Sequence, residues 1–353
     1  MEYGSIFDAH ANASFEKEHT AFLRPEWRLY RSGRDAMKAL ARIAGRRRVL
    51  LPALCCESMI SPFVLNGYEA VFYRLRGDLR GDEADVREKL RNADLLLYMP
   101  YFGIRPFSDA FLQELRGQGV LLAEDRTQDL VVPRGAAAFV PDATVASLRK
   151  WAYLPEGGML CTERGNCGAP ENPEFGDLCQ KAMEEKVRYM EDGQPGRKQR
   201  FLEQFHTAEK LLDVDGEPAA MSGTYREIAL KLDFSAVYEA RRDNLLYLQE
   251  KLRPLRDEGR LDFLSGTPEE STLYLPVILE KRDAVQRAMA ERKIYCPVIW
   301  PEPPELRGVC PVSHEVTRRM LALPVDQRYG RQEMDFFAEC LADILLTTGE
   351  RDI

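Results

Sequence analysis

Short apolar runs alternate with amphipathic stretches over the first half of this chain, and this alternation limits the folds it can adopt. The runs "VLLPAL", "EAVFYRL", "DLLLYMP" and "VLLAED" have the length and composition of buried strands. Between them, apolar residues recur at helical spacing, as in "EADVREKLRNA" and "SDAFLQELRGQG". Strands that alternate with helices of this length are typical of a largely parallel sheet with both faces covered. We therefore predict an α/β fold with a mostly parallel sheet sandwiched by helices.

The pattern changes in the second half of the chain. Residues 1–30 read as an arm, residues 170–250 are mostly helical in character, and "VDGEPAAMSG" interrupts them as a loop. The last hundred residues mix two predicted strands, "STLYLPVIL" and "IYCPVIW", with two predicted helices, "RDAVQRAMAERK" and "RQEMDFFAECLADILL". This mixture predicts a smaller α+β domain. We place the boundary near residue 237, which gives a large domain with its arm at 1–236 and a small domain at 237–353.

The charge balance and the cysteines narrow the class of protein. With 49 basic and 57 acidic residues, the net charge of -8 disfavours nucleic acid or an anionic membrane as the main partner. No run is apolar enough to span a bilayer, and the polar start "MEYGSIFDAH" does not read as a signal peptide. The eight cysteines show no disulfide spacing and the four histidines no metal-site spacing. These features predict a cytoplasmic protein with reduced thiols and without a metal.

Polar residues occur where strands are predicted to end or a helix to begin. Three such groups are Ser32 with Gly33, Asp125 with Gln128, and Ser147 with Lys150. In an open α/β sheet, ligands bind at the carboxyl ends of the strands, so these groups could converge on one ligand. Each group also has an ordinary interpretation as a helix cap, loop polarity or a solvated lysine. The residues taken singly leave both interpretations open.

Taken in chain order, the motifs resemble those of a known family. The segments "SGRDAM", "LPALCCES", "AEDRTQD", "SLRKW" and "PEGGML" resemble successive motifs of the fold-type-I pyridoxal-phosphate enzymes, and most of all the DegT-type sugar aminotransferases. The resemblance continues through "YEARRDNLLYLQEKL" and "LALPVDQRYG" and so covers most of the chain. It implies the aspartate-aminotransferase-like fold, pyridoxal 5′-phosphate (PLP) as cofactor, and a homodimer with its sites at the interface.

The resemblance assigns roles to three residues near the cofactor ring. Lys150 would form the Schiff base with the cofactor aldehyde and then carry protons as a general acid and base. Asp125 would pair with the pyridine nitrogen and keep it protonated, and Gln128 would donate a hydrogen bond to the phenolic oxygen. Arg149 is the neighbouring basic residue, but a guanidinium is not readily deprotonated and cannot replace the lysine. Lys150 and Asp125 are thus the predicted catalytic residues.

The cofactor phosphate requires hydrogen-bond donors. Backbone N–H groups of Gly33 and Arg34, at the helix start after Ser32, would supply them together with the helix dipole. The hydroxyl of Ser147 could add another donor. Asp35 would repel a phosphate and is left out of the site. We expect Lys38, in the same helix, to be solvated.

Other positions depart from the family pattern or stay open. Family members often cover the cofactor ring with an aromatic side chain after the second strand, but this chain has "ALCC" there. Cys56 is therefore the predicted cover, with Tyr98, Tyr101 or Phe102 as alternatives. The serine-to-lysine spacing in "SLRK" is also shorter than in many sugar aminotransferases.

Three further polar residues have weaker assignments. By analogy, Ser222 or Thr224 could reach the phosphate of a neighbouring subunit. Arg328 could hold a substrate carboxylate, although an exposed arginine is the simpler expectation there.

The function predicted from the resemblance is transfer of an amino group from an amino-acid donor to a carbonyl acceptor, with a sugar nucleotide as a candidate acceptor. Two alternatives remain open. One is a PLP-dependent lyase or decarboxylase, because the same electron sink supports those reactions. The other is a non-catalytic binding protein with the PLP-enzyme fold, which the missing aromatic favours and the presence of Lys150 disfavours.

Overall fold

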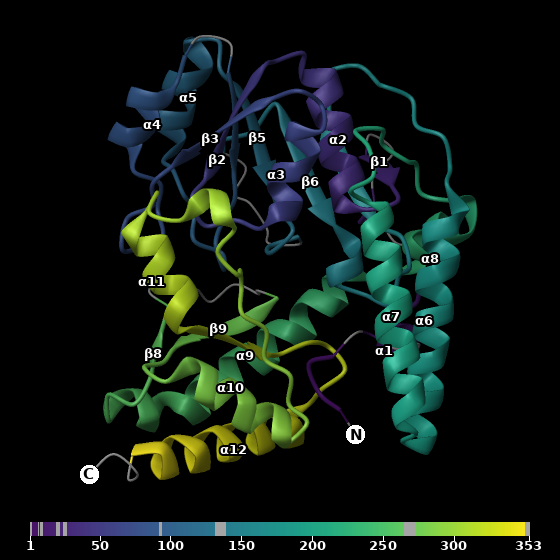
Figure 1. Ribbon diagram of the computed structural model, residues 1–353, viewed down its shortest axis with the longest axis vertical. Helices are drawn as coiled ribbons and strands as arrows, with labels where there is room; N and C mark the ends of the chain where they lie inside the picture. The colour runs from purple at the N-terminus through teal and green to yellow at the C-terminus, as the bar shows by residue number, and fades with distance from the viewer. Residues whose placement is uncertain are drawn as a thin grey trace.

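A computed structural model describes residues 2–5, 7, 10–18, 22–23, 27–91, 94–130, 139–264 and 273–349 (Figure 1). Its main sheet has seven strands in the order β1-β7-β6-β5-β4-β2-β3. Their bounds are β1 (Trp27–Tyr30), β2 (Arg48–Pro52), β3 (Glu69–Tyr73), β4 (Leu95–Tyr98), β5 (Leu121–Asp125), β6 (Ala143–Ser147) and β7 (Gly158–Thr162). Strands β2 to β6 run parallel, whereas β7 is antiparallel to both β6 and β1. The predicted α/β fold with a mostly parallel sheet is confirmed.

The helices of this layer begin where the sequence predicts them. They are α2 (Gly33–Ala44), α3 (Glu57–Val64), α4 (Glu83–Lys89) and α5 (Asp109–Gly117). Side-chain caps start three of them, since Ser32, Asp82 and Ser108 each accept hydrogen bonds from first-turn N–H groups. Strand side chains such as Leu50, Leu96 and Leu122 are fully buried, which explains why these runs are apolar throughout.

The second half of the chain contributes a helical hairpin and a smaller sheet. The hairpin is α6 (Pro173–Asp192) and α7 (Pro195–Leu211), which run side by side along one flank of the molecule in Figure 1. After α8 (Gly223–Lys231) and α9 (Phe234–Asp257) comes an antiparallel sheet in the order β10-β9-β8. The strands of this sheet are β8 (Asp262–Phe263), β9 (Tyr274–Ile278) and β10 (Met320–Pro324). The helices of the same region are α10 (Arg282–Glu291), α11 (Pro311–Arg319) and α12 (Arg331–Gly349). None of the helices in the described ranges could cross a membrane.

Three short segments differ from the sequence prediction. "IYCPVIW" is not a strand: Ile294 makes only an isolated bridge to Tyr3, and Pro297 has no N–H to donate to a ladder. Conversely, β10 lies inside the motif "LALPVDQRYG", and β1 lies in the predicted arm. Strand β1 is only four residues long and lacks full burial, so it carries little pattern.

The predicted domain boundary near residue 237 falls inside α9. The first turns of α9 pack against the large sheet's side of the molecule, where Val237 shares a cluster with Trp151. Further along, Leu245, Leu248 and Leu252 pack against the small sheet. One helix therefore contributes to two cores, and the domain division stays a prediction.

Gly158 lets β7 pass directly behind the start of α2. A Cβ atom at this position would lie 1.8 Å from the carbonyl oxygen of Ser32 and 2.9 Å from the backbone nitrogen of Gly33. We expect Gly158→Ala to lower the free energy of unfolding by about 2 kcal/mol or more, since overpacking typically costs about 1–3 kcal/mol. The atoms that the added methyl group would meet belong to the backbone, so they cannot move aside as a flexible side chain would. Urea denaturation of the variant and the wild type would measure this free-energy difference.

Gly77→Ala is the matched control for this variant, because a Cβ atom at Gly77 meets nothing within 4 Å. It should change the unfolding free energy little. Equal stability of the two variants would contradict the close approach of β7 to α2.

Candidate active site

The carboxyl edge of the main sheet meets the start of α2, and a cavity opens between them. We call it the edge cavity. It is lined by residues from α2, α3, α7 and the ends of β5 and β6: Ser32, Gly33, Arg34, Met37, Cys56, Ser58, Met59, Asp125, Thr127, Ser147, Arg149, Lys150, Glu209 and Leu212. All of the predicted cofactor-binding residues except Gln128 are in this lining. The structure thus brings these residues together, while their roles remain predictions.

Asp125 ends β5 at this cavity and is almost fully buried. Its carboxylate accepts a hydrogen bond from the Thr127 backbone N–H at 2.9 Å. Burial raises the pKa of Asp125 above its ordinary value, although the hydrogen bonds from Thr127 and the charge of Lys150 oppose the rise. A cationic nitrogen held against this carboxylate would therefore be favourable, because it would supply the missing counter-charge.

Gln128 is also buried, one turn beyond Asp125, outside the cavity lining. Its side-chain oxygen accepts a hydrogen bond from the Phe102 N–H at 3.3 Å. With the oxygen used in this way, the amide NH₂ is the end of the side chain that stays available to donate. Trp151, which is fully buried, holds the turn between them by donating from Nε1 to the Thr127 carbonyl at 2.8 Å.

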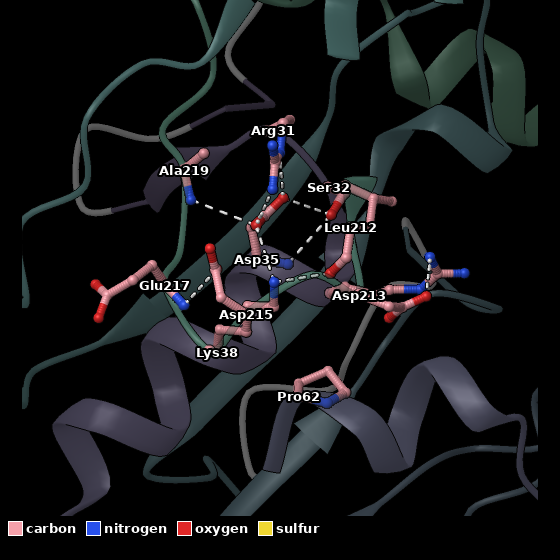
Figure 2. Close-up of polar contacts among 12 residues, drawn as sticks. Arg31, Ser32, Asp35, Lys38, Pro62, Leu212, Asp213, Asp215, Glu217 and Ala219 are labelled. Atoms are coloured by element: carbon pink, nitrogen blue, oxygen red, sulfur yellow. Dashed lines mark hydrogen bonds and ion pairs between the residues drawn. The ribbon is translucent and has the colours of Figure 1, made fainter. Parts of the chain in front are cut away.

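The start of α2 is built around Asp35 (Figure 2). Arg31 donates two hydrogen bonds of 2.9 Å to its carboxylate, and the Ser32 hydroxyl donates a third of 2.7 Å. The Ala219 N–H adds a fourth contact at 3.3 Å. The hydrogen bonds that the carboxylate accepts come from Arg31, Ser32 and Ala219, and not from the backbone N–H groups of Gly33 and Arg34. The Ser32 hydroxyl is occupied by Asp35, which leaves the backbone N–H groups of Gly33 and Arg34 as the possible anion donors.

The expectation that Lys38 is solvated is wrong. Its side chain is fully buried, and Nζ donates to the Leu212 carbonyl at 2.7 Å and lies 3.9 Å from the Asp35 carboxylate (Figure 2). Burial lowers the pKa of Lys38. The loop between α7 and α8 covers this side of α2, and the periodicity of α2 gave no sign of that cover.

Glu209 of α7 is a charged residue of the cavity that sequence reasoning missed. Its carboxylate lies 2.8 Å from the Arg149 guanidinium and 3.2 Å from that of Arg34. Burial alone would raise the pKa of Glu209, but these two cations outweigh it and hold the pKa below the usual value. Glu209 is 60 residues from Arg149 in sequence, within a stretch that shows only helical character.

Lys150 sits in a short 3₁₀ turn after β6 and is exposed toward the cavity. Its backbone carbonyl accepts a hydrogen bond from the buried Arg241 at 3.4 Å, so the main chain is held while the amine remains accessible. Ser147, three residues earlier, is buried at the end of β6, and a Cβ atom on Gly33 would approach its Cβ to 3.2 Å. The glycine therefore permits the close contact between α2 and β6.

A second cavity of about 440 Å³, the outer cavity, lies on the other side of Arg149 and Lys150. Its lining comes from the N-terminal arm, the hairpin and the small sheet: Gly4, Ser5, Phe7, Ser147, Arg149, Lys150, Leu154, Met183, Phe205, Glu209, Arg241, Leu273, Tyr274, Pro297, Asp326 and Arg328. The expected exposure of Arg328 is wrong: its side chain is only 11% exposed and lies 2.7 Å from Asp326. A neighbouring carboxylate therefore already balances its charge.

The remaining candidates have mixed outcomes. Cys56 lines the edge cavity, whereas Tyr98, Tyr101 and Phe102 are buried in the core and are not among the lining residues of either cavity. Ser222 and Thr224 line a separate pocket at the start of α8. Their proposed contact with a neighbouring subunit stays a prediction.

Comparison with known proteins identifies the fold. No family model and no curated protein matches this chain by sequence. Its structure is similar to that of DesI determined in the presence of its TDP-sugar product (TM-score 0.65, 18% identity, 92% of this chain and 83% of that one).

Two further solved structures are similar. PseC of Helicobacter pylori, an aminotransferase involved in pseudoaminic acid biosynthesis, has a TM-score of 0.63 at 12% identity, over 91% of this chain and 87% of that one. NtdA of Bacillus subtilis with bound cofactor PMP has a TM-score of 0.66 at 12% identity, over 90% of this chain and 73% of that one. This chain therefore has the fold of the PLP-dependent aminotransferases, as the motif resemblance implied.

The burial of Asp125 predicts an effect on stability that depends on pH. Because its pKa is raised in the folded state, the folded protein binds a proton that the unfolded chain releases, so stability falls as pH rises above the ordinary aspartate pKa. Asp125→Asn keeps an acceptor for the Thr127 N–H and removes the free-energy cost of burying a charged carboxylate. We expect the cofactor-free variant to melt at a higher temperature than wild type at pH 7.

The difference in melting temperature should shrink as the pH is lowered toward about 4, where the unfolded chain also holds the proton. Differential scanning calorimetry across this range would measure it. A variant that is less stable than wild type at pH 7 would show that the Asp125 carboxylate is compensated in the cofactor-free protein.

Proposed function

We propose that this protein is a PLP-dependent aminotransferase and that the edge cavity holds its cofactor. The observation that carries the proposal is the pairing, in one cavity, of a buried carboxylate without a strong cationic partner and an accessible lysine amine. Asp125 supplies the first and Lys150 the second. The donor set at the start of α2 suits a phosphate, because Asp35 is turned away from it and Gly33 allows close approach. The residues present thus fit the cofactor.

When bound, PLP supplies an electron sink for the bond-breaking step at the substrate carbon. Asp125 would hold the ring nitrogen in its protonated form, because the buried carboxylate gains its counter-charge there. Gln128 would donate from its amide to the ring oxygen. Lys150 would provide the amine that reacts with the cofactor aldehyde and, once free, would take a proton from the substrate carbon at Nζ.

The outer cavity is the proposed substrate site, because Lys150 lines both cavities. We propose an amino-acid donor and a carbonyl acceptor, with a sugar nucleotide as the acceptor class. The likeness to DesI, whose structure was determined with a TDP-sugar product, supports that class. The apolar side chains of Phe7, Leu154 and Phe205 in the lining would exclude water from the reacting carbon.

We propose that the active enzyme is a cytoplasmic homodimer. Its eight cysteines are free, which agrees with a reducing compartment. The pocket at Ser222 and Thr224, away from both cavities, is the surface we propose for contact with the second subunit. Sedimentation of the purified protein would test the dimer.

The cofactor proposal predicts a visible absorption band when the protein is incubated with PLP. Lys150→Ala should lose the band completely, because it lacks the reacting amine, while Lys181→Ala, which removes an exposed lysine of α6, should keep it. A band of equal intensity in the Lys150→Ala protein, or no band in wild type, would overturn the proposal.

The reaction class predicts how this band responds to added donors and acceptors. An aminotransferase should bleach the band with an amino acid and regain it with a stoichiometric amount of keto acid. Absorbance together with product analysis would measure both half-reactions. Loss of the amino acid without amino transfer to any acceptor would instead indicate a lyase or decarboxylase.

A further inference from the structure

Arg34 and Arg149 place two guanidinium groups beside the predicted phosphate position. Arg34 is in the first turn of α2, and Arg149 comes after β6, two residues beyond Ser147. Both line the edge cavity. The Nε atom of Arg149 is buried and has no hydrogen-bond partner in the part of the chain that the structure describes. Two guanidiniums at one point form a site for an anion with several oxygens, such as a phosphate monoester.

The carboxylate of Glu209, which belongs to α7 and not to the sheet, is bound by both of these guanidiniums. Its two carboxylate oxygens are divided between them, with Oε1 at 2.8 Å from Arg149 and Oε2 at 3.2 Å from Arg34. It is therefore bound as an external anion would be, one oxygen to each cation. Ser147, Arg149, Lys150 and Glu209 are the residues shared by the two cavity linings, so this ion pair stands between the cavities.

The small volume of the edge cavity also indicates that Glu209 takes up space that a ligand would need. The edge cavity has a volume of about 100 Å³, whereas sites for small molecules usually measure about 300–1,000 Å³. The outer cavity, beyond Glu209, adds about 440 Å³. Glu209 is one of the four residues that line both spaces, and of these four it is the one contributed by α7.

Glu209 would not itself become a buried charge on leaving, and the incoming anion would replace it as the counter-charge of Arg149. Its side chain is 38% exposed, so the carboxylate can turn into water. The end of α7 is held separately, because Lys38 donates to the Leu212 carbonyl (Figure 2). Arg34 also pairs with Asp213, just beyond this point. The side chain could therefore move while α7 stays in place.

We propose that Arg34 and Arg149 form a side-chain subsite for the phosphate ester of the cofactor, and that Glu209 is an internal anion that the phosphate displaces. A phosphate that entered beside Glu209 would meet a like charge, whereas one that replaces it takes over both guanidiniums. The exchange also opens the edge cavity toward the outer cavity. This inference rests on the proposed function for the identity of the ligand.

The test uses inorganic phosphate, pyridoxal 5′-phosphate and pyridoxal without phosphate as separate probes. Glu209→Gln should bind inorganic phosphate about tenfold or more tightly than wild type, since the competing charge is gone. Affinity for PLP should rise in parallel. Affinity for pyridoxal, which keeps the ring and the aldehyde but lacks the phosphate, should not change. Titration calorimetry would measure phosphate, and absorbance would measure the two aldehydes.

Two sets of variants separate displacement from a general charge effect. Glu203→Gln removes an exposed carboxylate from the same helix and should leave the affinity for phosphate unchanged. In backgrounds that carry Arg34→Gln or Arg149→Gln, the gain from Glu209→Gln should be reduced, because the guanidinium that it frees is absent. Thermal melting of each variant would show that the fold is intact.

The outcomes distinguish this inference from the function on which it rests. An unchanged affinity for phosphate in Glu209→Gln, or an equal gain for pyridoxal, overturns the displacement even if the wild type shows the PLP band. A gain for phosphate without any PLP band in wild type upholds the anion subsite and overturns the cofactor proposal.

Discussion

The buried carboxylate of Asp35 is the contact on which the geometry of the site depends. It joins β1 through Arg31, the first turn of α2 through Ser32, and the segment before α8 through Ala219. Arg31 is itself buried, so loss of its partner would leave an unpaired charge, which typically costs about 3–5 kcal/mol. The turn between β1 and α2 is thereby fixed and is joined to the segment before α8, which is 184 residues away in sequence, so that the start of α2 lies at the ends of β5 and β6.

Charge in the edge cavity is distributed unevenly around this fixed helix start. At one end Asp125 is a buried carboxylate without an ion pair among the described residues, and at the other Arg34 and Arg149 share the carboxylate of Glu209, while Arg34 also pairs with Asp213. A ligand with a cationic nitrogen at one end and a phosphate at the other would complement both. PLP has that distribution of charge, which is why the proposed function agrees with the electrostatics as well as with the fold.

Sequence reasoning predicted β2, β3, β4 and β5 because each lies in a short, mostly apolar run, and it missed β1, which has no such run. It predicted that Asp125, Ser147 and Lys150 would lie close together because parallel strands bring their carboxyl ends to one edge, and all three line the edge cavity, while their roles stay predictions. It missed Glu209 and the burial of Lys38 because both depend on contacts of α2 with α7 and with the loop after α7. The periodicity of a helix shows which of its faces is apolar, but not which element packs against that face. Contacts between residues more than 50 positions apart leave no local signal in the sequence.

The helical hairpin α6–α7 contributes three side chains to the outer cavity. Met183 and Phe205 line that cavity alone, whereas Glu209 also lines the edge cavity, whose other proposed cofactor residues come from the strands and α2. Each residue inserted in a helix turns the rest of it by about 100°, so a one-residue change near the start of α7 would replace every side chain it presents. Substrate preference could therefore diverge among relatives through this hairpin while the sheet and its catalytic chemistry stay constant.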